Sequence, residues 1–229
     1  MDKLKTLIIG ATGIVGQQAM SILHNHPQFE ITSLAASEKS SGKTYLDAIT
    51  RNNVRQWYAE GELPETLAIM KLQNATSLNP TYFDVVFSCV ESDVAKTLEP
   101  LFAQHTAVIS TASAFRYEDD VPLIIPQVNP QHSMLIAKQR KNRKWKGFIA
   151  PIPNCTTTGL AISLKPLDDA FGLKEVVMTS MQAISGAGRS PGVAALDIID
   201  NVIPFIQGEE EKVQKETQKI LRKSVNVSS

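Results

Sequence analysis

Residues 6–20 read TLIIGATGIVGQQAM, an apolar run followed by three glycines and a segment with helical spacing. The apolar run predicts a buried strand, and the residues after the glycines predict a helix. Glycines at this spacing permit a tight turn in which the backbone approaches a pyrophosphate at a helix N-terminus. The stretch predicts a dinucleotide site, although a plain strand-to-helix turn shares the pattern. The expected cofactor contacts are Gly10, Thr12, Gly13, Ile14, Val15 and Gly16.

The strand-like run 30–37 bears on the choice between the two nicotinamide dinucleotides. An acidic residue at its end would favour a free ribose 2′-hydroxyl. The chain has instead Ser37-Glu38-Lys39-Ser40-Ser41-Gly42-Lys43, whose hydroxyls and lysines suit a 2′-phosphate. We therefore expect NADP(H), with Ser37 and Ser40 as contacts and Glu38 facing solvent. The alternative is a polar surface loop.

Two further apolar runs, 83–90 and 106–110, flank a helical stretch at 92–104. Strands and helices that alternate with short connections predict an α/β protein with a Rossmann-type, doubly wound parallel sheet. Ser88 is an expected cofactor contact, because open α/β sheets bind ligands at the carboxyl ends of their strands. Cys89 is expected in the core. Two prolines within 123–130 predict an edge or a loop there.

A cysteine follows the next strand-like run, in Pro151-Ile-Pro-Asn154-Cys155-Thr-Thr-Thr-Gly159. If the helix predicted after it begins here, the thiol of Cys155 meets unpaired backbone N–H groups and the positive end of the helix dipole. That setting favours the thiolate and any oxyanion formed beside it, as a nucleophile requires. The alternative is a small buried hydrophobic residue, which is the usual environment of a free cysteine.

The segment after Cys155 changes character. A helix is expected to reach Ala170, and residues 174–185 then form a β-rich run that ends near Gly186 and Gly188, two glycines expected to admit the cofactor against the backbone. Beyond Gly208 the sequence predicts a charged helix. We therefore expect two units, a dinucleotide-binding domain at 1–153 and a partial α+β catalytic and dimerisation domain at 154–229.

Composition excludes several classes of function. The 229 residues are 43% hydrophobic, and 23 basic residues balance 23 acidic ones, so we expect binding to neither nucleic acid nor membranes. No leader or spanning apolar run is evident. Two cysteines make no disulfide framework, which predicts a reducing, cytoplasmic location.

The polar clusters predict no further site. The basic run 138–146 resembles the solvated end of a helix more than a nucleic-acid patch in which Trp145 stacks on a base. The four histidines lack metal-ligand spacing, so no metal site is expected. All four are interpreted as surface residues: His24, His26, His105 and His132.

Four stretches together resemble the aspartate-semialdehyde dehydrogenase family, in its archaeal and fungal branch. They are 10–16, 153–157, 181–188 and the long run 197–212, and the match covers nearly the whole chain in order. Malonyl-CoA reductase shares much of this pattern, and N-acetyl-glutamyl-phosphate reductase shares its layout. Tyr117 and Gln127 depart from residues common in the branch.

The resemblance implies a reaction and the groups that perform it. Cys155 would attack the acyl phosphate of aspartyl phosphate, inorganic phosphate would leave, and the thioester would be reduced by NADPH to the aldehyde. Asn154 and the helix amides would hold the oxyanion, and Gln182 would orient the substrate as a catalytic residue. The pathway implied is lysine, threonine and methionine biosynthesis.

The same resemblance implies the substrate contacts and the partner. Arg116 and Lys212 would bind the phosphate, and Glu209 would bind the substrate's amino group. For Glu209 and Lys212 the alternative is an exposed helix whose charges stand three residues apart. Family members pair through the second domain, so a homo-oligomer, dimer or tetramer, is expected.

Family members continue past this point with a histidine acid/base, an arginine for the substrate carboxylate and more strands. We therefore expect a truncated member that binds NADP weakly and turns over poorly, because losing a general base costs about 10²–10⁴-fold in rate. Two alternatives remain open from the sequence. One is a related thioester-forming reductase such as malonyl-CoA reductase, and the other is a non-catalytic nucleotide-binding or dimerising remnant.

Overall fold

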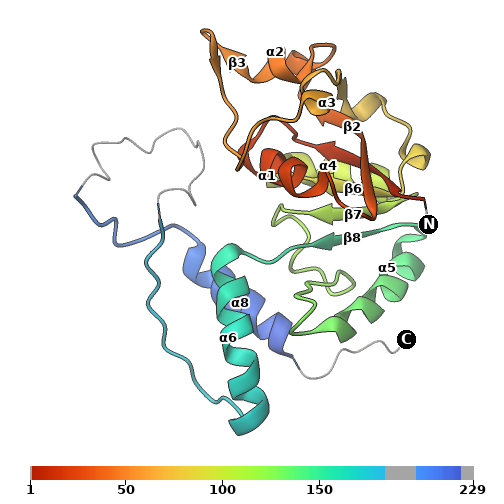
Figure 1. Cartoon of the computed structure of the whole chain (residues 1–229). Coiled ribbons are helices and arrows are strands. Elements are labelled where there is room, and N and C mark those ends of the chain that lie inside the picture. The colour runs from red at the N-terminus through yellow and green to blue at the C-terminus, as the bar shows by residue number, and fades with distance from the viewer. Residues whose placement is uncertain (1, 184–199, 223–229) are drawn as a thin grey trace.

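The computed structural model describes residues 2–183 and 200–222. Its centre is a six-stranded, wholly parallel sheet in the order β5-β2-β1-β6-β7-β8 (Figure 1). The chain builds outward from β1 in one direction and then, from β6, in the other, which confirms the doubly wound fold. The strands are β1 (Leu4–Ile9), β2 (Phe29–Ala36), β5 (Leu72–Asn74), β6 (Val85–Ser88), β7 (Ala107–Ser110) and β8 (Phe148–Pro151).

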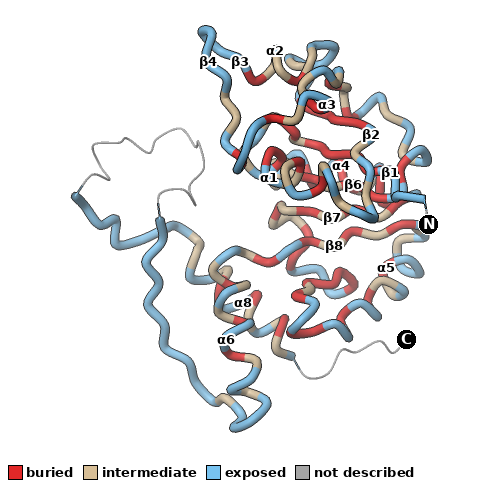
Figure 2. The backbone as a smooth tube through the Cα atoms, in the orientation of Figure 1, coloured by how far each residue is buried: buried red, intermediate tan, exposed pale blue. Residues whose placement is uncertain are grey.

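Alternate residues of β1 face opposite sides of this sheet, as a pleated strand requires. Ile8 packs in a cluster with Met20 of α1 (Ile14–Leu23), and Leu7 packs in another with Phe102 of α4 (Ser92–Ala103). Helices therefore cover both faces, and the strands are buried (Figure 2). This arrangement explains why the strands read as continuous apolar runs rather than as alternating ones.

The remaining elements surround this sheet or follow it. Residues 123–130 form no strand, as their prolines predict, and Asn129 holds their backbone by binding both Ile125 N–H and the Leu123 carbonyl. The other elements are α2 (Tyr45–Ile49), β3 (Thr50–Arg51), β4 (Val54–Arg55), α3 (Glu65–Ala68), α5 (Leu135–Arg143), α6 (Cys155–Phe171), α8 (Glu209–Leu221) and the 3₁₀ turns η1 (Glu38–Ser40), η2 (Ala75–Ser77), η3 (Pro80–Tyr82) and η4 (Pro130–Met134).

Helices α6 and α8 pack against each other beside the carboxyl end of β8 (Figure 1). Ala161 of α6 and Ile220 of α8 join Leu123, Ile125 and Val128 in a third buried cluster. The predicted helices at 155–170 and beyond Gly208 are both confirmed. The charged helix α8 is not exposed all round, because its Val213, Glu216 and Ile220 are buried.

The prediction of a β-rich run after α6 is wrong for the residues that the structure describes. Residues 173–183 form no strand, and Val177 and Met181 are 92% and 98% exposed. A strand needs a neighbour for its backbone N–H and C=O groups, and no other described strand lies beside this segment. Apolar, β-branched composition alone therefore did not form a strand here.

Two smaller predictions also need correction. His132 is buried rather than on the surface, and the burial lowers its pKa. The basic helix end is more than a solvated face, because Arg143 pairs with Asp120 and lies over the ring of Trp145, 5.2 Å from its centroid. Trp145 is half-buried and packs against the core. In the described residues, every helix is too short or too polar to span a bilayer.

Candidate active site

The first glycine of the N-terminal motif stands where no side chain fits. Gly10 follows β1 with a φ of +78°, and a Cβ on it would lie 2.3 Å from the Cys89 carbonyl oxygen. A Cβ on Gly16 would lie 2.3 Å from the Gly10 carbonyl oxygen, so α1 packs directly against the turn. Gly13 precedes the first helical residue, Ile14, and offers no side-chain cap.

This turn has the features that a pyrophosphate needs. The first-turn amides of α1 receive no side-chain cap. They follow β1, and the order in which the chain adds strands to the sheet reverses between β1 and β6. Thr12 and Ile14 are half-buried and Val15 is exposed, so these residues border open surface. Unpaired helix N–H groups and the helix dipole favour an anion there, and the residues present fit a dinucleotide.

The loop after β2 lies beside this turn, because β2 pairs with β1. Ser37 directly follows β2, and Ser40 ends the short turn η1. Glu38 is exposed, as the expected preference for a 2′-phosphate requires. The two serines therefore stand next to the strand that carries the glycine turn, where the ribose of a bound dinucleotide lies in this fold.

Ser88 ends β6 at the same edge, but its side chain is fully buried. The main-chain carbonyl of Ser88 accepts the Thr111 N–H at 2.9 Å. Nearby, Ser110 donates to the buried Glu99 carboxylate at 2.6 Å. Burial raises the pKa of Glu99, and it raises the pKa of Cys89 to about 12 with a further contribution from the Glu99 charge. Cys89 is half-buried rather than part of the core that the sequence predicts.

The other thiol has the opposite setting. Cys155 is exposed and is the first residue of α6, and Asn154 caps the helix by accepting the Thr157 N–H at 3.1 Å. Strand pairing aligns Ile9 with Ser88, Ser88 with Ser110, and Ser110 with Pro151. Because all these strands are parallel, the glycine turn and the loop that leads to Cys155 lie on one edge of the sheet.

Glu209, at the start of α8, gathers three polar side chains around the start of α6. Its carboxylate accepts from Asn154 Nδ2 at 3.0 Å, Thr156 Oγ1 at 3.1 Å and Gln182 Nε2 at 2.8 Å. Partial burial raises the pKa of Glu209, but these hydrogen bonds and the charge of Lys212 outweigh it and hold the pKa below its ordinary value. The structure therefore brings the predicted residues 154, 155, 182 and 209 together.

Arg116 is close to this group but turned inward. Its Nη1 donates to Glu216 at 3.0 Å and its Nη2 to the Thr111 carbonyl at 3.0 Å, which leaves its side chain 8% exposed. Lys212 is half-buried on the same helix as Glu209. The predicted residues Gly186 and Gly188 lie outside the described residues.

Sequence reasoning missed two residues of α8, Glu216 and Lys219. Glu216 also accepts the Asn154 backbone N–H at 2.7 Å, and Lys219 Nζ donates to the carbonyls of Arg116, Glu118 and Val121. Both stand seven residues after predicted site residues, at 209 and 212, and therefore on the same helix face. That spacing was a signal that could have identified them.

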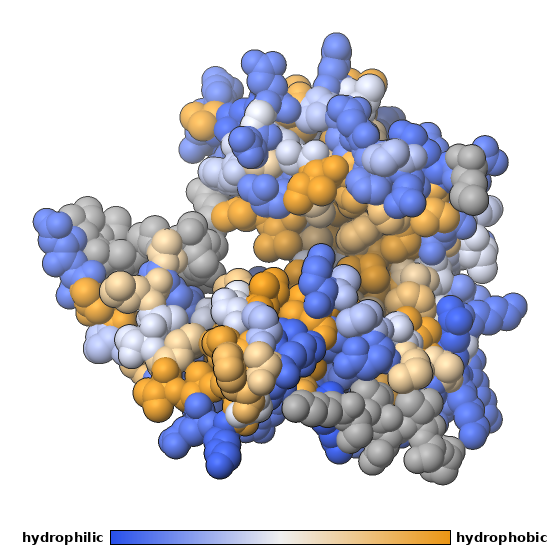
Figure 3. Space-filling view, turned by 60° about the horizontal axis from the view of Figure 1, so that its bottom comes forward, coloured by the Kyte–Doolittle hydropathy of each residue, from blue (hydrophilic) through white to orange (hydrophobic). Residues whose placement is uncertain are grey.

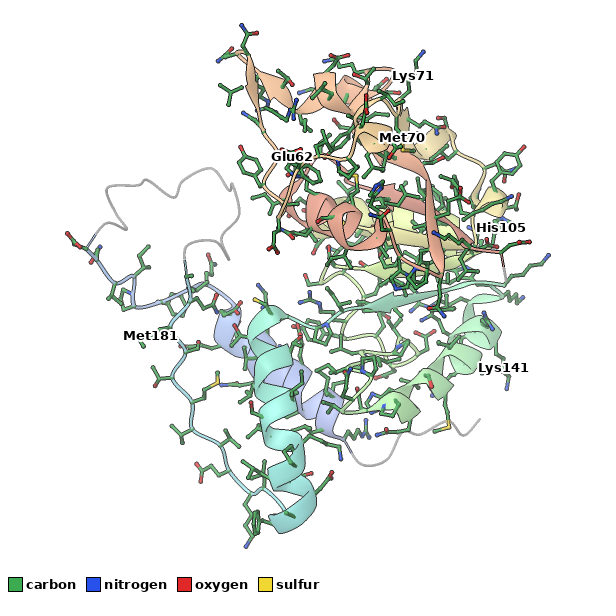
Figure 4. All side chains as sticks on the ribbon, in the orientation of Figure 1. Glu62, Met70, Lys71, His105, Lys141 and Met181 are labelled. Atoms are coloured by element: carbon green, nitrogen blue, oxygen red, sulfur yellow. The ribbon has the colours of Figure 1, made fainter. Side chains whose placement is uncertain are left out.

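Apolar side chains are exposed around α6 and its flanking segments. Met181 projects from the extended segment after α6, away from the helices (Figure 4), and hydrophobic side chains gather over this part of the molecule (Figure 3). Those at least two-fifths exposed are Ile152, Ile162, Leu167, Phe171, Val176, Val177, Met178, Met181, Val202, Ile203, Phe205 and Ile206. An exposed apolar area of this extent is typical of a surface that another protein surface covers.

Comparison with known families gives two matches along the chain. Residues 5–136 match the family model described as "Semialdehyde dehydrogenase, NAD binding domain". Residues 164–228 match the one described as "Semialdehyde dehydrogenase, dimerisation domain". The first covers more than half of the chain and contains the whole glycine turn, and the second contains α8.

Individual relatives agree with these matches. An aspartate-semialdehyde dehydrogenase of Archaeoglobus fulgidus is 49% identical over 219 residues, which are 94% of this chain and 61% of the relative. The crystal structure of aspartate semialdehyde dehydrogenase with NADP from Candida albicans superposes with a TM-score of 0.80 at 40% identity, over 96% of this chain and 60% of that one. The chain thus spans about 60% of the length of these relatives.

A reductase with another substrate in its name is also similar. The malonyl CoA reductase (NADP) of Metallosphaera sedula is 39% identical over 219 residues, 95% of this chain and 59% of that protein. Its identity is lower than that of the Archaeoglobus fulgidus relative. The comparison therefore does not favour malonyl-CoA as the substrate.

Proposed function

Because the chain belongs to the semialdehyde dehydrogenase family, we propose that it catalyses the NADPH-dependent reductive dephosphorylation of L-aspartyl-4-phosphate to L-aspartate-4-semialdehyde. The observation that carries this proposal is the exposed thiol of Cys155 at the first position of α6, on the edge of the sheet where the glycine turn lies. The reaction belongs to lysine, threonine and methionine synthesis, in the cytoplasm. The domain boundary that we propose, after residue 153, falls between the two family matches.

In the first step the Cys155 thiolate attacks the acyl carbon, the bond from that carbon to the phosphate oxygen breaks, and inorganic phosphate leaves. The product is a thioester on Cys155. The carbonyl oxygen carries negative charge during the attack, and the N-terminal amides of α6 and the Asn154 side chain stabilise it. For this, Asn154 Nδ2 exchanges its present acceptor, Glu209, for the substrate oxygen.

The dinucleotide is held by the chain's N-terminal turn. Gly10 and the residues 12–16 bind the pyrophosphate, and Ser37 and Ser40 bind the 2′-phosphate that distinguishes NADP from NAD. The chemistry that NADPH supplies when bound is a hydride for the thioester carbon. Ser88 helps to shape this crevice through its main chain, and Gly186 and Gly188 complete the contacts.

Four side chains bind and orient the substrate. Glu209, whose hydrogen bonds hold its pKa below the ordinary value, binds the amino group as a carboxylate. Gln182, within 2.8 Å of Glu209, orients the carbonyl next to the thiol. Lys212 binds the phosphate together with those N–H groups of the Arg116 guanidinium that Glu216 and Thr111 leave free.

The second family match and the exposed apolar residues around α6 support a homo-oligomer, in which a second copy covers this surface. The dimer or tetramer would then form through residues after the sheet. Neither nucleic acid nor a membrane is a proposed partner.

A single-turnover experiment tests the function without requiring steady-state turnover. Purified protein is incubated with NADP and aspartate semialdehyde without phosphate, and the Cys155 peptide is examined by mass spectrometry for the acyl adduct. We expect the adduct on Cys155 and none in Cys155→Ser. Adding phosphate should release it. An adduct from malonyl-CoA in its place would favour the related reductase, and no adduct from either substrate would refute catalysis and favour a non-catalytic remnant.

A further inference from the structure

The residue that joins the two halves of the candidate site is Glu216, in the middle of α8. Its side chain is 0% exposed, and each carboxylate oxygen has a different partner. Oε1 accepts from Arg116 Nη1 at 3.0 Å, and Oε2 accepts from the backbone N–H of Asn154 at 2.7 Å. Arg116 belongs to the loop after β7 and Asn154 to the loop after β8.

We propose that Glu216 is a positioning residue that fixes the Arg116 guanidinium relative to the backbone immediately before Cys155. The proposal rests on the proposed function, in which Arg116 meets the phosphate and Cys155 the acyl carbon of one substrate. These two groups must be held at a set separation, since reaction requires the attacking and attacked atoms to be aligned. One buried carboxylate that binds both loops supplies that constraint.

Lys219 binds the backbone of the loop that carries Arg116. Its ammonium group donates to the carbonyls of residues 116, 118 and 121 at 2.7–2.9 Å, so the loop backbone is bound to the same helix as the side chain. Arg116 is thus fixed by α8 at both its main chain and its guanidinium. The separation of Glu216 and Lys219 by three residues places both groups on the helix face that meets these loops.

A purely stabilising role would not need this chemistry. Buried ion pairs often contribute no more stability than apolar residues of the same size, because desolvation offsets their attraction. The two partners of Glu216 are in separate loops, and both loops carry residues of the site. Charged partners also impose a direction that apolar packing does not. The geometry therefore favours positioning over stabilisation.

The test uses the full chain with inorganic phosphate as the probe. Alkylation of Cys155 by iodoacetamide is measured at rising phosphate concentration in the native chain, Glu216→Gln, Arg116→Ala and the double variant. The matched control is Glu210→Gln, an exposed glutamate of the same helix. We expect Glu216→Gln to raise the half-protecting phosphate concentration about tenfold or more, the usual consequence of losing a charge-assisted hydrogen bond. The control should match the native chain.

The double variant separates positioning from any independent effect. If Glu216 acts through Arg116, Glu216→Gln adds no further loss in the Arg116→Ala background. The proposal would be overturned if the double variant needed more phosphate for half-protection than Arg116→Ala alone. It would also be overturned if phosphate protected Glu216→Gln as well as it protects the native chain. If Glu216→Gln does not fold, Glu216→Asp, which keeps the charge but is one methylene shorter, is measured against the same criteria.

Hydrogen exchange distinguishes failure of this proposal from failure of the proposed function. If phosphate does not protect Cys155 from alkylation even in the native chain, the assigned phosphate site is wrong. Amide hydrogen exchange then tests the positioning role of Glu216. Faster exchange in Glu216→Gln confined to the peptides spanning 111–121 and 152–158 would support positioning. Faster exchange throughout the chain, or in neither peptide, would refute it.

Discussion

The sheet region, residues 4–151, and the region from Cys155 onward differ in how their elements are held in place. In the first, each of the six strands pairs with a parallel neighbour and helices pack on both faces. In the second, α6 and α8 pack with residues 123–128 in one small buried cluster, and Val177 and Met181 after α6 are almost fully exposed. The apolar strands of the first region are therefore buried, whereas an apolar segment of the second region is exposed.

The difference shows that a strand is a property of pairing as much as of composition. Residues 85–88 and 174–181 have similarly β-prone sequences, but only the first lies between two strands. The second region has a site geometry that depends on charged contacts from α8. Its apolar surface is available for a partner.

The largest expected contrast is between the two cysteines, since each region contains one. We expect iodoacetamide at pH 8 to label Cys155 at least about a hundred times faster than Cys89, because the half-buried Cys89 has a pKa of about 12 and almost no thiolate. Peptide mass spectrometry measures both rates in one sample. Cys155→Ser is the control, and rapid labelling in that variant would show that the sheet region opens more readily than its burial indicates.

Limited proteolysis should also separate the regions. Subtilisin is expected to cut within 173–183 at least about ten times faster than within the sheet region, because an exposed, unpaired backbone needs no unfolding to enter a protease. Fragment masses locate the cuts. Protection of 173–183 at high protein concentration, with unchanged cutting elsewhere, would show that a second copy covers the segment. Equal cutting in both regions would remove the distinction between them.

The glycine turn gives a test within the sheet region. Gly10→Ala should lower the free energy of unfolding by about 1–3 kcal/mol more than Gly61→Ala, because only at Gly10 does the new Cβ meet the backbone. Gly61 is the matched control, with the same φ of +78° and no atom within 4 Å of the added Cβ. Urea unfolding measures both variants. Equal losses of unfolding free energy would mean that the turn accommodates the added Cβ without strain.

The smallest effect concerns Glu99, which is buried in the sheet region beside Ser110. Burial raises its folded pKa above the ordinary value of 4.5, so the folded state binds more protons than the unfolded state above pH 4.5. Its contribution to stability is complete below pH 4.5 and is lost as the pH rises through the folded pKa.

Glu99→Gln replaces the carboxyl with a permanently neutral group of the same shape. We expect its Tm to exceed the native Tm by a few degrees at pH 8 and to approach it at pH 4.5. Glu62→Gln, at an exposed position before α3, is the matched control. A Glu99→Gln difference that is constant with pH would indicate that Glu99 titrates normally.

Local patterns predicted the features that neighbouring residues determine. The glycine turn, the order of strands and helices, the position of Cys155 at a helix start and the extent of α6 followed from spacing and composition. Features that depend on distant segments did not. The burial of His132, the contact of Asn154 with Glu209 and the inward turn of Arg116 all involve α8 or elements far along the chain.

The ion pair between Arg116 and Glu216 joins residues 100 positions apart, so translation itself sets an order of assembly. A ribosome that adds roughly 5–20 residues per second needs about 5–20 s to make the intervening segment. All six strands are synthesised before α8 emerges, and during that interval the guanidinium lacks its Glu216 partner. The nascent sheet can therefore fold before α8 covers this edge, and in that interval chaperones would encounter an uncovered loop.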